Sequence, residues 1–309
     1  MNGTRTQNLY RGGTMAMQKK KRKKRNLNKP NEKKNFLKRI FQSGEAKPLP
    51  DTELISTGNF YLLKWIAFIC MVMDHIAAMF YDYYVWNDDC YIAFRLIGRI
   101  AFPIFAYELV ESFHHTKHKG KHFLRIGILA LVSEIPFDIA LGSTPFTLQA
   151  QNVCITLFLG FLMLWITNIN WSKWYYERGM KTKWFNHYIT GCTVVTITAV
   201  FALIARFFRS DYSWKGIVLI MMLDFARRRK YKKVWQVIAF MPFLLIQYTD
   251  VIWIGIALSL AFILTVEFDR KERNNVMARA LKSNFSRAIC RICYPLHLTV
   301  LIVIKLILV

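Results

Sequence analysis

LKWIAFICMVMDHIAAMF, residues 63–80, is apolar enough to cross a membrane as an α-helix. Asp74 and His75 nevertheless stand next to each other in its second half. An ionisable side chain at such depth costs roughly 2.5–3.5 kcal/mol on insertion scales, so it usually faces a protein interior or a wet cavity rather than lipid. The stretch therefore predicts a membrane helix that contributes to a polar site inside a helix bundle.

The whole chain shares this apolar character. It has 309 residues, 54% of them hydrophobic, and a mean hydropathy of +0.22, which is too apolar for an ordinary soluble domain. Because the apolar runs are continuous rather than alternating, helices are favoured over membrane strands. The sequence predicts an all-α, polytopic membrane helix bundle of about nine transmembrane helices with a polar internal cavity. The nine apolar segments are 61–80, 91–113, 123–141, 152–169, 187–208, 214–226, 234–248, 251–267 and 288–309, of which 214–226 and 234–248 are short for a full crossing.

The segments between these spans differ sharply in charge. Lys and Arg number twenty in the segments 114–125, 170–186, 226–233 and 267–287, whereas the alternate segments contain only Arg209. Basic loops stay in the cytoplasm. The alternation therefore predicts a multi-pass protein of the cell (plasma) membrane with its N-terminus in the cytoplasm and its C-terminus outside.

The first fifty residues are strongly basic, with 15 Lys or Arg and 2 acidic residues. The run KKKRKKR at 19–25 would suit a nucleic acid or a nuclear address. Ahead of a membrane domain, it is more typical of a disordered tail that lies against anionic lipid. We therefore divide the chain into a basic cytoplasmic tail, 1–58, and a membrane domain, 59–309, with membrane lipids and not nucleic acid as partners.

Polar side chains from several predicted spans fall in one outer layer of the bundle. At about 1.5 Å per residue, Arg95 and Arg99 lie in the outer half of the second span, where their i,i+4 spacing makes them repel unless an acid or anion lies between them. Glu134 and Asp138 have the same spacing and depth in the third span. A hydrated cavity that opens outward would hold all these groups. The layer is completed by Asp74, His75, Asn152 at the start of the fourth span and Asp211 before the sixth.

These charged residues also have purely structural interpretations. The two arginines could neutralise Glu134 and Asp138 as ion pairs. His75 could be a hydrogen-bonded histidine of the bundle. Since adjacent helical residues point about 100° apart, Asp74 and His75 should contact different partners.

Four further histidines lie in the basic segment 114–125. They could form a metal cluster, but the lysines among them favour a solvated loop that faces phosphate or lipid. We therefore expect no metal site.

The last span offers a second candidate site. Arg287 and Arg291 are spaced i,i+4 at its cytoplasmic end, and His297 follows Pro295 near the middle of the membrane. Proline frees a backbone carbonyl and kinks a helix, often beside a cavity. The stretch could bind a ligand, or it could be a bent helix with an interfacial arginine pair.

Five stretches resemble a known family in order and spacing: LKWIAFICMVMDHIA, RLIGRIAFPIFAYELVESFHHT, RIGILALVSEIPFDIA, NVCITLFLG and YPLHL. They are similar to the TraX family of polytopic membrane proteins, named from conjugal-pilus assembly, and the likeness covers roughly 60–309. It implies acetylation of a pilin N-terminus. A looser likeness to transmembrane acyltransferases implies acetyl-CoA as the donor, entering from the cytoplasm. The chain departs from the family in its basic tail and at Ser213, where a glycine is expected after Asp-Tyr.

The implied acyl transfer needs a base and a group that stabilises the oxyanion. His75 is the candidate base, because histidine is the side chain that most readily exchanges a proton near neutral pH. Asp74 would hold its helix in position. Arg95 and Arg99 would stabilise the oxyanion or bind an anionic acceptor. Substrate binding or support is assigned to Glu134, Asp138, Asn152 and Asp211.

At the cytoplasmic mouth, Arg287 and Arg291, with the basic residues of 227–233, would bind the phosphates of CoA. His297 would line the path of the pantetheine arm or act as a second catalytic group. Direct transfer and a covalent acetyl-histidine intermediate both fit these residues.

The acceptor would be a peptide N-terminus such as that of pilin, or a surface glycan. Two other functions fit the sequence. One is a transporter or flippase in which Asp74 or Glu134 couples to protons. The other is a non-catalytic assembly protein.

Overall fold

The computed structural model describes residues 57–81, 87–142, 150–229, 231–246, 252–268 and 284–308. These residues form helices and turns, and their extended pairing is limited to one isolated bridge between Gln151 and Ser210. The prediction of an all-α fold is therefore confirmed. The predicted basic tail, apart from its last two residues, lies outside the described part of the chain.

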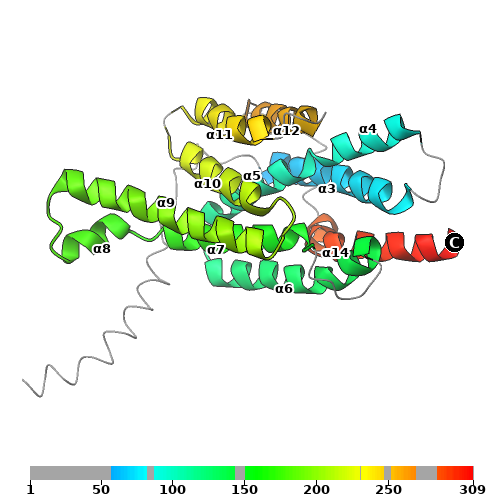
Figure 1. The fold of residues 1–309 in the computed structure, drawn as a ribbon, viewed down its shortest axis with the longest axis horizontal. Coiled ribbons are helices and arrows are strands. Elements are labelled where there is room, and N and C mark those ends of the chain that lie inside the picture. Colours follow the sequence, from blue (N-terminus) through cyan, green and yellow to red (C-terminus); the bar gives the residue numbers. More distant parts are fainter. Residues whose placement is uncertain are drawn as a thin grey trace, which may run out of the picture. The chain divides into compact units, whose positions relative to one another are not determined.

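A helix occupies each of the nine predicted apolar segments, and these helices run roughly along a common direction (Figure 1). The short helix α8 was not predicted. In chain order the helices are α3 (Thr57–Phe80), α4 (Asp88–Gly98), α5 (Ala101–His115), α6 (Lys119–Phe137), η2 (Asp138–Gly142, a π-helical turn), α7 (Val153–Thr167), α8 (Trp171–Glu177), α9 (Lys183–Phe207), α10 (Ser213–Arg227), α11 (Lys232–Ile246), α12 (Ile252–Phe268) and α14 (Asn284–Leu308).

The surface of the described helices suits a membrane. The large apolar side chains of Leu131, Leu203 and Phe207 are 74%, 67% and 82% exposed. Extensive apolar surface of this kind is rare on proteins in water and typical of contact with lipid. Four stretches of the described residues are long and apolar enough to cross a membrane, namely Phe60–Phe80, Asp88–His115, Val153–Glu177 and Lys183–Phe207. The chain is therefore a membrane protein, whereas the count of nine crossings stays a prediction.

The predicted segment 91–113 is not one continuous helix. The helix α4 ends at Gly98 and α5 begins at Ala101. Pro103 has no backbone N–H, so it cannot bond to the carbonyl of Arg99 one turn earlier, and its ring crowds that carbonyl. The predicted span lies within the apolar stretch Asp88–His115 but is divided into two helices, and Arg99 lies at the break.

The ends of the described helices fall into two groups, as expected of a chain that crosses a membrane back and forth. His114 at the end of α5 pairs with Asp224 near the end of α10. We call this the basic end of the bundle, because the basic segments that follow α5 and α10 lie there. At the opposite end, Glu134 near the end of α6 accepts a hydrogen bond from Asn152 just before α7. Which end faces the cytoplasm stays a prediction.

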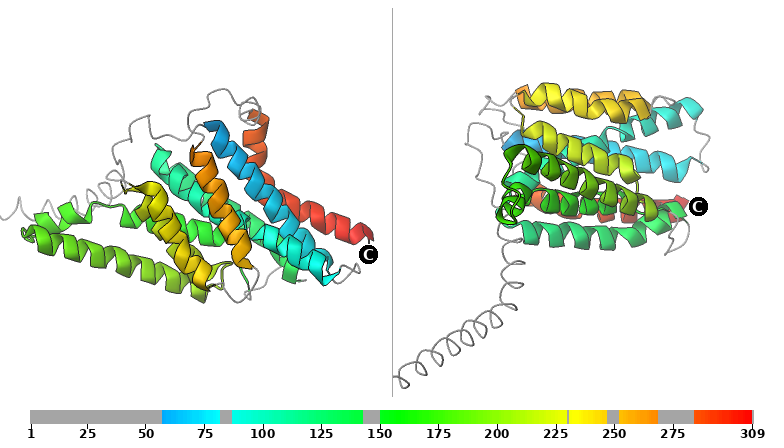
Figure 2. Two further views of the ribbon diagram at one scale, coloured as in Figure 1. Left: turned by 90° about the horizontal axis from the view of Figure 1, so that it is seen from above. Right: turned by 60° about the vertical axis from the view of Figure 1, so that its left-hand side comes forward.

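Three sets of helix contacts position the site. The helix α3 packs against α4, α5 and α14, while α6 packs against α7 and α14 and α10 packs against α9, α11 and α5. Figure 2 shows α14 bent in its first half, in a helix that contains Pro295. The bend agrees with the predicted effect of a proline. Between these helices lies an aromatic core that includes Phe102, Tyr107, Phe113, Phe161 and Phe240.

Candidate functional site

Two buried histidines from distant parts of the chain meet in the bundle. The Nδ1 atom of His75 on α3 lies 2.7 Å from the Nε2 atom of His297 on α14. Their rings stack with centroids 5.0 Å apart and an interplanar angle of 19°. The two residues are 8% and 7% exposed. Both were predicted as site residues, but their direct contact was not.

The contacts of the pair fix which nitrogen carries each proton. The Nδ1 atom of His297 lies 2.9 Å from the carbonyl oxygen of Cys293, which can only accept, so this Nδ1 carries the hydrogen. In a neutral ring the Nε2 of His297 is then an acceptor, and the Nδ1 of His75 must donate to it. This leaves the lone pair of His75 on Nε2, which hydrogen-bonds to none of the described residues. The arrangement makes that nitrogen a base.

Asp74 turns to a different partner from its neighbour, as predicted. Its Oδ2 accepts a hydrogen bond of 2.8 Å from Nη1 of Arg95 on α4. Its Oδ1 is buried, and no described residue donates to it. Gly98 allows this approach, since a Cβ atom there would stand 2.3 Å from Oδ1 of Asp74. The glycine between the two arginines of RLIGRI thus admits the carboxylate that pairs with the first of them.

Arg99 lies against the turn between α9 and α10. Its Nη1 donates to the hydroxyl of Tyr212 at 3.3 Å, and the Tyr212 ring stacks on Phe102 with centroids 3.9 Å apart. The Nε atom of Arg99 is buried without a hydrogen-bond acceptor among the described residues. The arginines therefore pair with Asp74 and Tyr212, and the alternative that they neutralise the two acids of the third span was wrong.

The turn that carries Tyr212 has an unusual backbone. Tyr212 and Ser213 have φ angles of +59° and +44°, in the left-handed region that glycine adopts most easily. The glycine expected at the position of Ser213 thus has a physical reason. Asp211 accepts a hydrogen bond from the Tyr212 backbone N–H at 3.0 Å, and its charge and that of Asp74 both act on Arg99. Three of the predicted residues are therefore neighbours.

Asn152 and Glu134 form a separate contact at the opposite end. Asn152 is fully buried, and its side-chain oxygen caps α7 by accepting from the backbone N–H groups of Cys154 and Ile155 at 2.8 and 3.3 Å. Its side-chain amide donates to Glu134 and, at 2.9 Å, to the carbonyl of Ala130. Asn152 is thus primarily a structural clamp between α6 and α7. Asp138 is buried in the π-helical turn η2 that follows α6.

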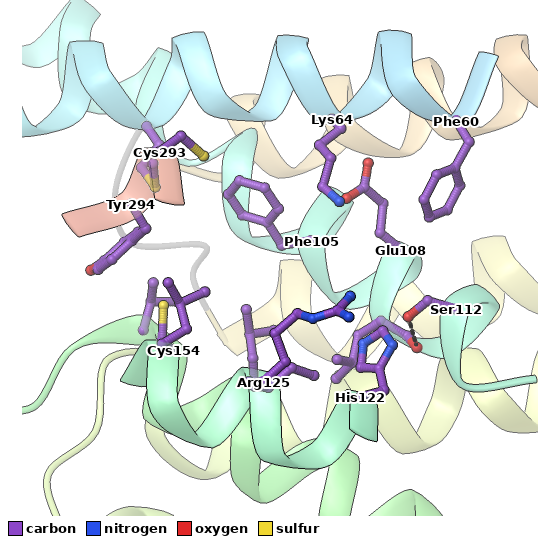
Figure 3. A pocket seen from close by; sticks show the side chains of 16 residues that line it. Phe60, Lys64, Phe105, Glu108, Ser112, His122, Arg125, Cys154, Cys293 and Tyr294 are labelled. Atoms are coloured by element: carbon purple, nitrogen blue, oxygen red, sulfur yellow. Dashed lines mark hydrogen bonds between the residues drawn. The ribbon is translucent and has the colours of Figure 1, made fainter. Parts of the chain in front are cut away.

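A cavity of about 210 Å³ lies among α3, α5, α6, α7 and α14. Figure 3 shows Cys154, Cys293 and Tyr294 at one end and Phe60, Ser112 and His122 at the other. The first group marks what we call the inner end, where the Tyr294 ring lies 6.2 Å from the ring of His75 and 5.4 Å from that of His297. Met71, which also lines the cavity, precedes His75 by one helical turn.

The position of this cavity differs from the prediction. We expected a polar cavity lined by the charged layer and open outward, but the lining residues are others, and the charged ones among them lie on the side of the basic end. These charged and ionisable lining residues are Lys64 on α3, Glu108 on α5, and His122 and Arg125 on α6.

Two buried acids organise the basic end. Glu111 accepts from Lys232 at 2.7 Å, Arg227 at 3.2 Å and His115 at 3.2 Å. It is 3% exposed, so its charge is held by surrounding cations rather than by water.

The second acid, Asp224, is fully buried and pairs with His114 at 2.5 Å and with Arg228. Asn168 at the end of α7 accepts from Arg228 at 2.9 Å and so joins the same network. His114 was expected in a solvated loop, and this was wrong, because α5 extends through His115.

These pairs bear on the proposed binding of phosphate by the segment 227–233. Three of its cations, at positions 227, 228 and 232, are held by Glu111 and Asp224. The side chains of Arg287 and Arg291 lie outside the described residues. Among the residues that the structure describes, no cluster of three or more His, Cys, Asp or Glu side chains could hold a metal ion.

A family model described as TraX protein matches residues 60–305. The chain belongs to the TraX family. A curated relative, the "Probable fimbrial assembly protein FimC, serogroup H1" of Dichelobacter nodosus, is 34% identical over 113 residues, which is 34% of this chain and 45% of that protein's length. No solved structure matches the chain. The resemblance drawn from the sequence motifs is therefore confirmed.

Sequence reasoning missed several polar residues of this TraX family member. Glu108, Glu111 and Asp224 are ionisable residues inside predicted apolar spans, and the rule that singled out Asp74 applies to them equally. Tyr212 and Tyr294 gave no comparable signal, because tyrosines are common at membrane interfaces and in cores.

Proposed function

We propose that this TraX family protein is a membrane-bound acyltransferase. It transfers an acetyl group from acetyl-CoA to a peptide N-terminus or a surface glycan that is reached from the opposite end of the bundle. The observation that carries this proposal is the hydrogen-bonded pair of His75 and His297, which leaves Nε2 of His75 as a buried base.

The cavity supports a donor that arrives from the basic end. Lys64, His122 and Arg125 line the cavity away from its inner end, where they suit phosphate groups. The inner end lies beside the histidine pair. A volume of about 210 Å³ is below the roughly 300–1,000 Å³ of pockets that bury most of a drug-sized ligand. In this proposal the pantetheine arm occupies the cavity and the nucleotide stays outside it. By the positive-inside rule this mouth faces the cytoplasm, where acetyl-CoA supplies an activated thioester.

The residues around His75 divide the acid–base work. Nε2 of His75 takes the proton from the acceptor amine or hydroxyl as that atom bonds to the acetyl carbon, and it returns the proton to the departing sulfur. Arg99, whose Nε has no acceptor among the described residues and whose charge reaches His75, stabilises the oxyanion. Arg95, already paired with Asp74, holds α4 against α3.

Acetyl transfer by the purified protein tests this proposal. Labelled acetyl-CoA is incubated with wild type, with His75→Ala, and with His187→Ala, which removes an exposed histidine of α9. We expect His75→Ala to lower transfer, or slow hydrolysis in the absence of acceptor, by at least about a hundredfold, because general bases contribute about 10²–10⁴. The control should keep its activity. Normal turnover in folded His75→Ala protein would remove the base assignment.

A non-catalytic role in assembly is the second candidate, favoured by the name of the relative, a probable fimbrial assembly protein. The same variant separates the two functions in cells. If pili or surface polymers are still assembled normally with His75→Ala at wild-type abundance, the protein acts as a scaffold. Loss of assembly together with loss of an acetyl group supports the enzyme.

A further inference from the structure

Glu108 is the most enclosed charged side chain that lines the cavity. It lies on α5, is 5% exposed, and its Oε1 atom is buried with no hydrogen-bond donor among the described residues. The positive charge of Lys64 on α3 acts on it. A buried acceptor without a donor is costly, more so when it is charged. Lys64 offsets part of the charge, but Oε1 itself receives no hydrogen bond from the described residues, so Glu108 is a candidate contact for a ligand.

The neighbours of Glu108 define the chemistry that such a ligand must have. On α5, Phe105 and Ser112 line the same cavity one turn before and one turn after Glu108 (Figure 3). Figure 3 shows Lys64 and Arg125 around Glu108, His122 beyond it toward the basic end, and Cys154, Cys293 and Tyr294 at the inner end. A matching ligand carries negative charge that Lys64, His122 and Arg125 can pair with, an N–H or O–H donor for Glu108, and an uncharged tip at the inner end.

We propose that Oε1 of Glu108 accepts a hydrogen bond from an amide N–H of the pantetheine arm of the donor. This inference rests on the proposed function, because it names how the acyl donor is held. The arm carries amide groups between its phosphate and its thioester, so it has donors at the required place. Glu108 is then a binding residue that sets the depth of the thioester relative to His75, and it takes no part in proton transfer.

The proposal makes stability and affinity move in opposite directions. Replacing Glu108 by methionine, which has a similar length and no charge, removes an unsatisfied buried carboxylate. The unliganded protein should therefore unfold at a higher temperature. The same change removes the acceptor for the arm, so binding should weaken. A carboxylate that only supports the fold would instead lower both quantities when replaced.

The experiment measures binding by calorimetry on purified protein in detergent. The probes are CoA, phosphopantetheine, and the nucleotide portion of CoA without its arm. We expect Glu108→Met to bind CoA and phosphopantetheine about tenfold more weakly and to bind the nucleotide portion as wild type does. Glu108→Gln keeps an acceptor oxygen and should lose less. The matched control is Glu177→Met, which makes the same change at an exposed glutamate of α8 that does not line the cavity.

The outcomes separate the two proposals. If wild type binds CoA and Glu108→Met binds it equally well, the Glu108 contact is overturned while the acyltransferase stands. If wild type binds neither CoA nor phosphopantetheine, both the assignment of acetyl-CoA as donor and the proposed Glu108 contact are overturned. Should Glu108→Met fail to fold, the stability argument is wrong, and Glu108→Gln decides the binding question. If Glu108→Gln weakens the binding of CoA by no more than it weakens the binding of the nucleotide portion, the contact is overturned.

Discussion

Gly98 of α4 lies directly against Asp74 of α3. A Cβ atom at position 98 would stand 2.3 Å from both Cβ and Oδ1 of Asp74, far inside van der Waals contact. This approach of two helices places the carboxylate within 2.8 Å of Arg95. Because Gly98 has no side chain, α3 and α4 can approach closely enough for Asp74 to pair with Arg95.

Gly98→Ala should therefore separate α3 from α4 and weaken the Asp74–Arg95 pair. We expect a loss of about 1–3 kcal/mol in the free energy of unfolding, the usual cost of overpacking, together with reduced acetyl transfer. Thermal unfolding in detergent checks the first effect. The control is Gly191→Ala on α9, where an added Cβ meets nothing within 4 Å and should be neutral or slightly stabilising. Equal stability of the two variants would contradict the close contact.

His297→Phe removes the acceptor for Nδ1–H of His75 while keeping an aromatic ring of similar shape. The imidazole of His75 is then no longer held with its lone pair on Nε2. We expect the turnover rate at saturating acetyl-CoA to fall at least about tenfold, with little change in KM, since loss of the correct tautomer can cost up to about 10⁴ in rate. His297→Gln, which keeps an acceptor oxygen, should retain more activity. A rise in KM alone would assign His297 to the donor path instead.

Asp224→Asn should destabilise the basic end. The carboxylate is fully buried and paired with His114 and Arg228, so its loss leaves those two groups without their counter-charge. We expect a loss of about 3 kcal/mol in the free energy of unfolding. The comparison is Glu177→Gln, which breaks the exposed pair with Lys173 at 4.0 Å and should cost less than about 0.5 kcal/mol. Similar small effects in both would show that the buried pair adds no stability.

Ser213→Gly should stabilise the protein. The φ angle of +44° at this residue strains any side chain with a Cβ atom, and glycine removes the strain. The expected gain is up to about 1 kcal/mol, measured as a higher midpoint of thermal unfolding. Ser213→Ala keeps the Cβ atom and should give no gain. A lower midpoint for the glycine variant would indicate that the serine hydroxyl stabilises the turn more than the strain costs.

Much of the fold was predictable because membrane helices are long and apolar. The position of Asp74 in such a helix was enough to infer an interior partner, and Arg95, one helix later, was among the few candidates. The break before α5 was readable in Pro103, but the continuous hydropathy of 91–113 masked it. A hydropathy scale scores the side chains and does not register that proline lacks a backbone N–H group.

The contacts between helices were not predictable from one sequence. The pairing of His75 with His297, 222 positions later, depends on how α3 and α14 are rotated about their axes, and no local pattern specifies that rotation. The same holds for His114 and Asp224. Charge patterns identified which residues need a partner, and the packing of apolar faces decided which partner each one found.

The carbonyl of Cys293 ends the hydrogen-bonded chain that runs from His75 through His297. When Nε2 of His75 takes up a proton, the positive charge can be shared with His297 through the hydrogen bond between the two rings. The carbonyl of Cys293 beyond His297 accepts a hydrogen bond but does not take up a proton. It must leave through the nitrogen by which it entered. The atom that gives up the proton and the sulfur that receives it therefore have to reach one nitrogen within a single catalytic cycle. In the proposed reaction the acceptor atom and the sulfur of the donor therefore exchange their proton with the same nitrogen of His75, one after the other.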